Sequence, residues 1–280
     1  MLIIEKRKWF YIFSLVVIIP GIISMFWQGF NLGIDFTGGS MLRYKMEASI
    51  ETPAVTKTIQ DLQIVTEVSV QKSGDEFYIR TNELNQEQTQ QLSNALETQY
   101  GTIELLSAES VGATIGGELV TNAFLAIGIA LVLMLIYITF RFEWTFGLAA
   151  VLSLFQGVLF VCGFFSLFQF EVNGAFIAAI LTIIGYSIND TIVIFDRVRE
   201  NLRMKKKDPM MTLLNKSIMQ TMNRSVNTVL TVLMPLIALL IFGGGTIKVF
   251  VIAMLVGFVY GAYSSICIAS PLYYEIKQRA

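Results

Sequence analysis

Hydrophobic residues in this chain gather in long stretches without charge, which alternate with short charged segments and one longer polar region. A helix needs about 20 consecutive apolar residues to cross the hydrocarbon core of a bilayer. Six stretches reach this length, and only the fourth contains a charged residue, Asp190. They cover residues 9–34, 119–140, 144–170, 172–195, 225–247 and 249–274. The pattern predicts an α-helical integral membrane protein with six transmembrane helices.

Composition agrees with this fold class and narrows the chemistry. The chain is 54% hydrophobic and only 15% charged, whereas soluble domains carry about 25% charged residues. Histidine is absent, which excludes imidazole bases, Ser-His-Asp triads and histidine-bound zinc. Cys162 and Cys267 both lie in apolar stretches, so we expect neither a disulfide framework nor a metal site. Any proton carrier must then be a carboxylate or another side chain.

Basic residues predict the orientation of the spans, because Lys and Arg are retained on the cytoplasmic side. They occur before the first span, between the second and third, after the fourth and after the sixth. We therefore expect both termini in the cytoplasm and residues 35–117 outside it. The first stretch is too long for a signal peptide and is read as an uncleaved anchor. The basic residues are Lys6, Arg7, Lys8, Arg141, Arg197, Arg199, Arg203, Lys205–Lys207, Lys277 and Arg279.

Residues 35–117 read as a separate domain between a first segment, 1–34, and a bundle of the remaining spans, 118–280. Its alternating and helical periodicities predict the order strand, helix, strand, strand, helix, strand. This βαββαβ order is typical of a ferredoxin-like α+β domain, which hosts many functions. We find no catalytic constellation in it and expect a partner-contacting module, not an enzyme. The elements are 41–46, 52–62, 64–71, 77–81, 85–100 and 103–108.

Asp190 is the most informative residue, because a carboxylate inside a span costs roughly 2.5–3.5 kcal/mol and usually faces protein or water. Thr182, Tyr186 and then Asn189 or Asp190 recur at intervals of three or four and form one polar stripe. Arg197 follows about 10 Å further along a helix. An interfacial carboxylate that reaches the headgroups is therefore the alternative interpretation.

Arg224 is the candidate partner of Asp190. Spans four and five are antiparallel neighbours in sequence, which would bring the two residues to comparable depth. Pairing would keep the carboxylate charged, and protonation would release it. A proton-driven switch and a static ion pair both fit this pattern. On a continuous helix, one face would carry Ser217, Thr221, Arg224, Thr228 and Thr231.

Several short motifs occur along the chain. Gly33–Gly39 has the pattern G-x-D-F-x-G-G, with Asp35, Gly38 and Gly39 at its defined positions. A second motif runs from Val111 to Leu119 and contains Gly116 and Glu118. The most distinctive run is Gly185–Thr191, which continues to Asp196 and Arg197, and further motifs lie in Gln220–Thr228 and Tyr263–Pro271. Together these motifs resemble those of the SecD/SecF family of the Sec protein translocase, and the resemblance covers nearly the whole chain.

This resemblance implies a function of the SecF type. Such a chain is similar to half of a resistance-nodulation-division transporter and pairs with SecD in the bacterial cytoplasmic membrane. It acts with the SecYEG channel, with SecA upstream and YajC as a further candidate partner. It would use the proton-motive force, without any cofactor, to promote late translocation and release of exported polypeptides. The family's proton-handling Asp and Arg fall on Asp190 and Arg224.

Two other interpretations stay open. A small-molecule exporter of the same superfamily would normally need two six-helix halves and larger external domains. A structural scaffold of the translocase would tolerate changes at Asp190 and Arg224. Membrane lipids are expected contacts in each case, and nothing in the charge balance of 20 basic and 21 acidic residues points to nucleic acid.

Overall fold

The computed structural model describes residues 2–204 and 208–279, which form two compact units. One unit is Leu32–Ala123, and the other is the helical remainder of the described chain. The basic run Lys205–Lys207 lies outside the described residues. Six of the described helices are long and apolar enough to cross a membrane, as predicted. Their bounds are α1 (Arg7–Trp27), α5 (Ala113–Arg141), α6 (Trp144–Phe168), α7 (Gly174–Met204), α8 (Met210–Phe242), and α9 (Gly245–Ser264) continued by α10 (Ser270–Arg279).

Four spans, α1, α5, α7 and α8, differ from the prediction by more than five residues at one end; α5 begins at Ala113, not at 119, and α7 ends at Met204, not at 195. α1 stops at Trp27, not at residue 34, because Gly29 takes a left-handed φ of 69°. The short elements β1 (Asn31–Leu32) and α2 (Ile34–Thr37) follow it, and β6 (Glu171–Val172) precedes α7. α8 begins at Met210, well before the predicted 225. Charged residues limit the apolar stretch but not the helix, which extends beyond it.

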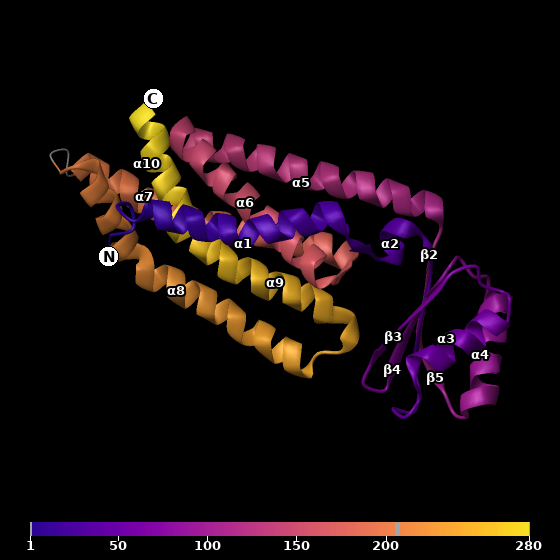
Figure 1. Cartoon of the computed structure of the whole chain (residues 1–280). Coiled ribbons are helices and arrows are strands. Elements are labelled where there is room, and N and C mark those ends of the chain that lie inside the picture. Colours follow the sequence, from indigo (N-terminus) through magenta and orange to yellow (C-terminus); the bar gives the residue numbers. More distant parts are fainter. Residues whose placement is uncertain (1, 205–207, 280) are drawn as a thin grey trace. The chain divides into compact units, whose positions relative to one another are not determined.

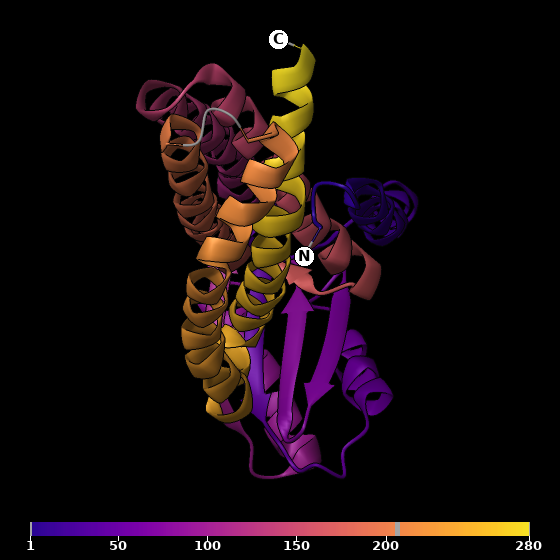
Figure 2. The same cartoon turned by 90° about the vertical axis from the view of Figure 1, so that its left-hand side faces the viewer.

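The helices of the larger unit pack through small residues and hydroxyl groups. α8 and α9 are antiparallel neighbours joined at Gly243 and Gly244 (Figures 1 and 2). Gly21 of α1 lies against Gly163 of α6, where a Cβ on Gly21 would come within 2.7 Å of the Gly163 Cα. Glycine is thus required for this close approach.

The last span contains a π-turn at Ser265–Ala269 between α9 and α10. Pro271 lies two residues after the end of this turn, behind Ser270, and has no N–H for the helical ladder. Its ring would clash with the carbonyl of residue 267 in a regular α-helix. The wider turn relieves that clash without breaking the span.

Ion pairs gather both chain ends at one end of the helical unit (Figure 1). They connect the N-terminal residues to α10, α10 to the connection between α5 and α6, and the end of α5 to α7. The four groups of basic residues therefore share one end of the unit, as far as the structure describes them. The pairs are Arg7–Glu275 at 2.9 Å, Glu143–Lys277 at 2.8 Å and Arg141–Asp196 at 3.4 Å.

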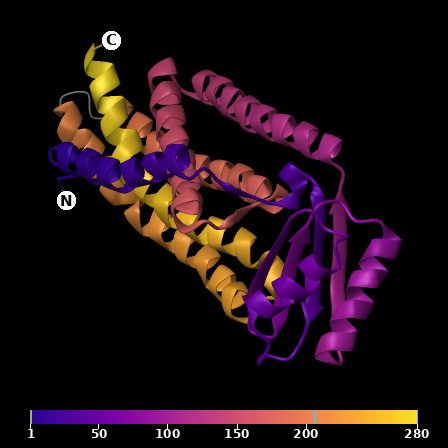
Figure 3. The ribbon, with the colours of Figure 1, turned by 45° about the vertical axis from the view of Figure 1, so that its right-hand side comes forward.

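The smaller unit contains a four-stranded sheet in the order β3-β4-β2-β5, with each neighbouring pair antiparallel (Figure 3). Its elements follow the predicted sequence of strands and helices. They are β2 (Gly39–Lys45), α3 (Thr52–Asp61), β3 (Val68–Ser73), β4 (Glu76–Thr81), α4 (Gln86–Tyr100) and β5 (Glu104–Val111). β3 starts later than the predicted residue 64, because Ile64 and Val65 pack against the core from outside the sheet.

The core of this unit lies between the sheet and its two helices. Fully buried side chains come from alternate strand positions and from one face of each helix, and each contributes about 1.5–3 kcal/mol of burial free energy. Asn85 and Gln88 cap α4 reciprocally, as their spacing predicts. Burial raises the pKa of the Tyr44 hydroxyl, against the opposing effect of its hydrogen bond with Ser93. The main core residues are Leu42, Tyr44, Val55, Ile59, Phe77, Ile79, Leu92 and Leu96.

Candidate functional site

Asp190 lies on the buried face of α7, with 5% of its surface exposed. One carboxylate oxygen, Oδ1, accepts a hydrogen bond from the Ser225 hydroxyl of α8 at 2.6 Å. The other oxygen, Oδ2, is buried and has no hydrogen-bond donor within the described residues. Buried polar atoms are nearly always satisfied in folded proteins. The unpaired oxygen therefore marks Asp190 as a functional candidate.

The direct ion pair expected between Asp190 and Arg224 is not present. Both residues are described, and Ser225 takes the position facing the carboxylate. Successive residues on a helix point about 100° apart. Once Ser225 faces α7, Arg224 is turned toward the exposed side of α8.

The predicted polar stripe on α8 accordingly divides between two environments. Ser217 and Thr221 are buried, and the Ser217 hydroxyl accepts a hydrogen bond from Asn201 of α7 at 2.8 Å. Thr228 is half-buried and Thr231 is exposed, and both donate to backbone carbonyls of their own helix. The residues of α8 that face α7 are four apart, as Ser217, Thr221 and Ser225 are. The predicted stripe instead alternated between spacings of four and three residues.

The stripe on α7 divides in the same way. Tyr186 precedes Asp190 by one turn, and its ring packs on Phe258 of α9 with centroids 4.3 Å apart. Its hydroxyl is buried without a partner in the described chain, like Oδ2 of Asp190. Asn189 and Thr182 are exposed. Tyr186 thus belongs with the Asp190 site, and Asn189 lies on the outer face.

A cluster of buried hydroxyl groups, which the sequence reasoning missed, lies beside Asp190. The Thr191 and Ser265 hydroxyls are 2.9 Å apart, and Ser265 donates to the carbonyl of Ser187 at 3.2 Å. Ser265 begins the π-turn. Ser187 and Thr191 are four residues apart and flank Asp190. The spacing of Ser187 and Thr191 could have indicated a polar helix face from the sequence alone. It did not identify Ser265 as the residue that pairs with them.

Chemically, this arrangement can hold and release a proton. Ser225 fixes one oxygen of the carboxylate and leaves the other open to protonation. A buried carboxylate changes from charged to neutral when it binds a proton, which alters the balance of forces between α7 and α8. No cluster of three or more candidate metal ligands occurs within residues 2–204 and 208–279.

The two glycine-containing motifs meet inside the smaller unit. Gly38 and Gly39 have φ values of 74° and 118°, and a Cβ at Gly39 would collide with the Thr81 carbonyl. A Cβ at Gly116 would come within 2.9 Å of the Phe36 carbonyl oxygen. These glycines thus allow close backbone contact between the start of the sheet and α5.

The remaining motif residues have structural placements. Asp35 lies in the first turn of α2, where a negative charge is favoured, and Glu118 is exposed on α5. Asp196 pairs with Arg199 at 3.0 Å and with Arg141. The Arg197 Nε donates to Gln220 of α8 at 2.7 Å. Asp196 and Arg197 thus join the charged ends of three helices and do not contact Asp190.

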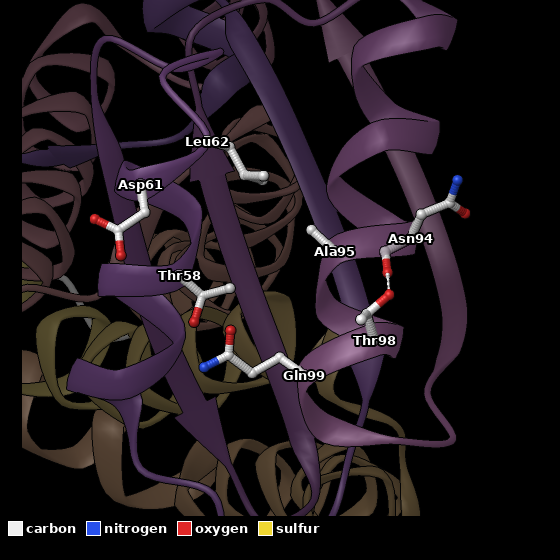
Figure 4. A pocket seen from close by; sticks show the side chains of 7 residues that line it. All are labelled: Thr58, Asp61, Leu62, Asn94, Ala95, Thr98 and Gln99. Atoms are coloured by element: carbon white, nitrogen blue, oxygen red, sulfur yellow. Dashed lines mark hydrogen bonds between the residues drawn. The ribbon is translucent and has the colours of Figure 1, made fainter.

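A groove of about 560 Å³ lies between α3 and α4 of the smaller unit. Figure 4 shows Gln99 of α4 reaching toward Thr58 of α3, whereas Asn94 points away. Asp61 is the single charged residue in its described lining. This groove has no convergent set of reactive groups, so Asp190 stays the stronger candidate.

Comparison with known proteins decides the family. The sequence model described as "Protein export membrane protein SecD/SecF, C-terminal" matches residues 91–279, and that of the SecD/SecF GG motif matches residues 23–50. The chain belongs to the SecD/SecF family. The SecF subunit of Sebaldella termitidis is 45% identical over 99% of this chain and 92% of its own length. The SecF subunit of Acidaminococcus fermentans is 42% identical over 99% of this chain and 97% of its own length.

Fused members of the SecD/SecF family extend the comparison to solved structures. SecDF of Bacillus subtilis is 40% identical over 98% of this chain, which spans 38% of that longer protein. The crystal structure of Thermus thermophilus SecDF, described as translocon-associated, matches with a TM-score of 0.90 and 37% identity. The match covers 99% of this chain and 38% of the SecDF chain. The chain is therefore a multi-pass membrane protein with a role in protein export.

Proposed function

We propose that this chain is a proton-coupled SecF-type subunit that promotes the late translocation and release of exported polypeptides. It pairs with SecD and acts with the SecYEG channel after SecA has begun the transfer, with YajC as a further partner. The observation that carries this proposal is the buried Asp190 carboxylate with one oxygen fixed by Ser225 and one unpaired.

The energetic argument starts from the cost of charge in a membrane. A carboxylate in a span costs roughly 2.5–3.5 kcal/mol, and protonation removes that cost. A proton that crosses 100 mV supplies about 2.3 kcal/mol. One proton can therefore bias a two-state movement of α7 against α8, and repeated cycles would be needed to advance a long polypeptide.

Arg224 contributes to this proposal through its charge and not through contact. It neighbours Ser225 on α8 and lies on the exposed side of that helix. An arginine remains protonated throughout the physiological range. Its fixed positive charge would favour the ionised state of Asp190 and help return the carboxylate to that state after each proton passes.

The exposed face of α7 is the proposed contact for SecD. Thr182, Gly185 and Asn189 lie there, and no atom of the described residues approaches within 4 Å of a Cβ built at Gly185. Small residues let transmembrane helices approach closely. The fused SecDF relatives, which contain this region in a longer chain, support the pairing.

The proposal includes an orientation and two fold assignments. The end of the helical unit that holds the chain ends and basic groups would face the cytoplasm of a bacterial plasma membrane. The smaller unit would lie outside, and its strand order supports a ferredoxin-like assignment. The helices would form half of a resistance-nodulation-division arrangement.

The proposal is tested in inverted membrane vesicles that contain the Sec channel and motor. We expect a proton gradient to accelerate completion of translocation when this chain and SecD are present, and a protonophore to abolish that acceleration. Vesicles without the pair control for effects on the motor. An identical protonophore effect with and without the pair would leave a structural scaffold as the function.

Replacement of Ser225 by Ala is expected to reduce the gradient-stimulated rate about tenfold. It removes the hydrogen bond that orients the carboxylate, and hydrogen bonds to charged groups contribute about 1.5–3 kcal/mol. Ser225→Thr keeps a hydroxyl and should recover most of the rate. Ser217→Ala removes an equally buried hydroxyl from the same helix face. Equal losses in the two Ala variants would assign Ser225 a packing role only.

A further inference from the structure

A second candidate site lies at the charged end of the helical unit. A groove of about 850 Å³ lies between the end of α5, the C-terminal part of α7 and the segment Gln220–Arg224 of α8. Five arginines line it, against two carboxylates in its described lining. The arginines are Arg141, Arg197, Arg199, Arg203 and Arg224, and the acids are Asp196 and Glu200.

Internal ion pairs leave this groove with unpaired positive charge. Glu200 pairs with Arg197, and Asp196 is shared by Arg199 and Arg141. Arg203 and Arg224 form no ion pair inside the described ranges. Five positive and two negative charges give a net charge of +3 over the described lining. An anion with several acceptor oxygens is the complementary ligand.

Two of the arginines, Arg141 and Arg199, are held close together. Phe142 lies beneath both of them, with the guanidinium carbons of Arg141 and Arg199 at 5.2 and 4.8 Å from its ring centre. The Arg199 side chain also donates to the backbone carbonyl of Arg141 at 2.9 Å. These contacts hold the two planar guanidinium groups near each other. A guanidinium group can donate two parallel hydrogen bonds to the oxygens of a phosphate.

Exposed apolar residues lie close in sequence to the lining residues, and they favour a lipid over a free anion as the ligand. Phe140 is 88% exposed one residue before Arg141, and Met204 is exposed one residue after Arg203. Val226 and Leu230 are exposed on α8 beyond Arg224. A ligand that satisfies both surfaces has a negatively charged phosphate and long hydrocarbon chains.

We propose that this groove binds the phosphate headgroup of an anionic phospholipid, with the acyl chains along the exposed apolar residues of α5 and α8. The proposal concerns a lipid site and does not rest on proton passage at Asp190, although Arg224 contributes its charge to both sites. A net basic surface attracts anionic membranes without specificity. The test must therefore separate a defined site from a general charge effect.

The test is native mass spectrometry of the full chain in mixed micelles of phosphatidylglycerol and phosphatidylcholine with identical acyl chains. We expect the unaltered chain to retain phosphatidylglycerol preferentially. Arg203→Gln breaks no ion pair of the described chain and should lower that retention about fivefold, at about 1 kcal/mol per surface arginine. The double change Arg199→Gln/Arg203→Gln should lower it about 30-fold.

Arg279→Gln is the matched control, because it removes an exposed arginine outside the groove and should retain the lipid. Thermal unfolding of each variant separates lost binding from lost folding. Equal retention of the two lipids, or the same loss in Arg279→Gln as in Arg203→Gln, would overturn the proposal. Displacement of the lipid by excess inorganic phosphate would also overturn it in favour of a free-anion site.

Discussion

Export in cells whose only copy of this subunit carries Asp190→Asn is expected to lose its proton-dependent component at least tenfold. Asparagine has nearly the same shape, and its carbonyl oxygen can still accept the Ser225 hydrogen bond. It cannot bind and release a proton. The change therefore removes titration while it preserves packing between α7 and α8.

The measurement is the rate of precursor export, with the membrane level of the subunit and its co-purification with SecD determined in the same cells. Asp208→Asn makes the same chemical change at an exposed position between α7 and α8. It should export at the unaltered rate. If Asp190→Asn exported normally from an intact complex, Asp190 would be a structural polar group, and the coupling site would have to lie in SecD.

Replacement of Gly163 by Leu is expected to destabilise the helical unit by about 3 kcal/mol, the upper part of the range for overpacked cores. A Cβ at this position would lie 2.8 Å from the Gly21 Cα of α1, where backbone and not a flexible side chain must move. The neighbouring Ser24–Ser166 hydrogen bond of 2.8 Å would also be pulled apart.

Gly157→Leu provides the control on the same helix, because a Cβ built there has no neighbour within 4 Å among the residues that the structure describes. The measurement is thermal unfolding of the purified full chain in detergent, together with its yield from membranes. We expect Gly163→Leu to unfold at a clearly lower temperature than Gly157→Leu. Equal unfolding temperatures would mean that α1 and α6 can separate without cost.

Much of the fold could be predicted because its signals are local. The lengths of the apolar stretches identified the six long helices. A segment that crosses lipid must satisfy its own backbone hydrogen bonds, which a helix does. The alternation of strand residues and the Asn85 cap placed most elements of the smaller unit within a few residues. One end of each of α1, α5, α7 and α8 was missed by more than five residues, because the residue at which an apolar stretch meets a charge is not the residue at which the helix begins or ends.

The candidate site was predictable only in part. Asp190 stood out in the sequence as an ionisable residue within an apolar span, whatever its neighbours. Its partner did not, because the α8 sequence presents polar residues on two adjacent faces. Arg224 and Ser225 are consecutive, so a rotation of about 100° exchanges which one faces α7. Charge complementarity favoured the arginine in the sequence, and the packed structure places the serine there.

The sequence by itself thus determined the membrane-spanning plan, the order of elements in the smaller unit, the family motifs and the importance of Asp190. Only the tertiary structure decided that Ser225 holds its carboxylate, that Ser265 joins Thr191, and that five arginines surround one groove. These features depend on the rotation of each helix about its axis. That rotation is set by contacts between residues far apart in the chain, such as Gly261 against Ser187, which local periodicity does not specify.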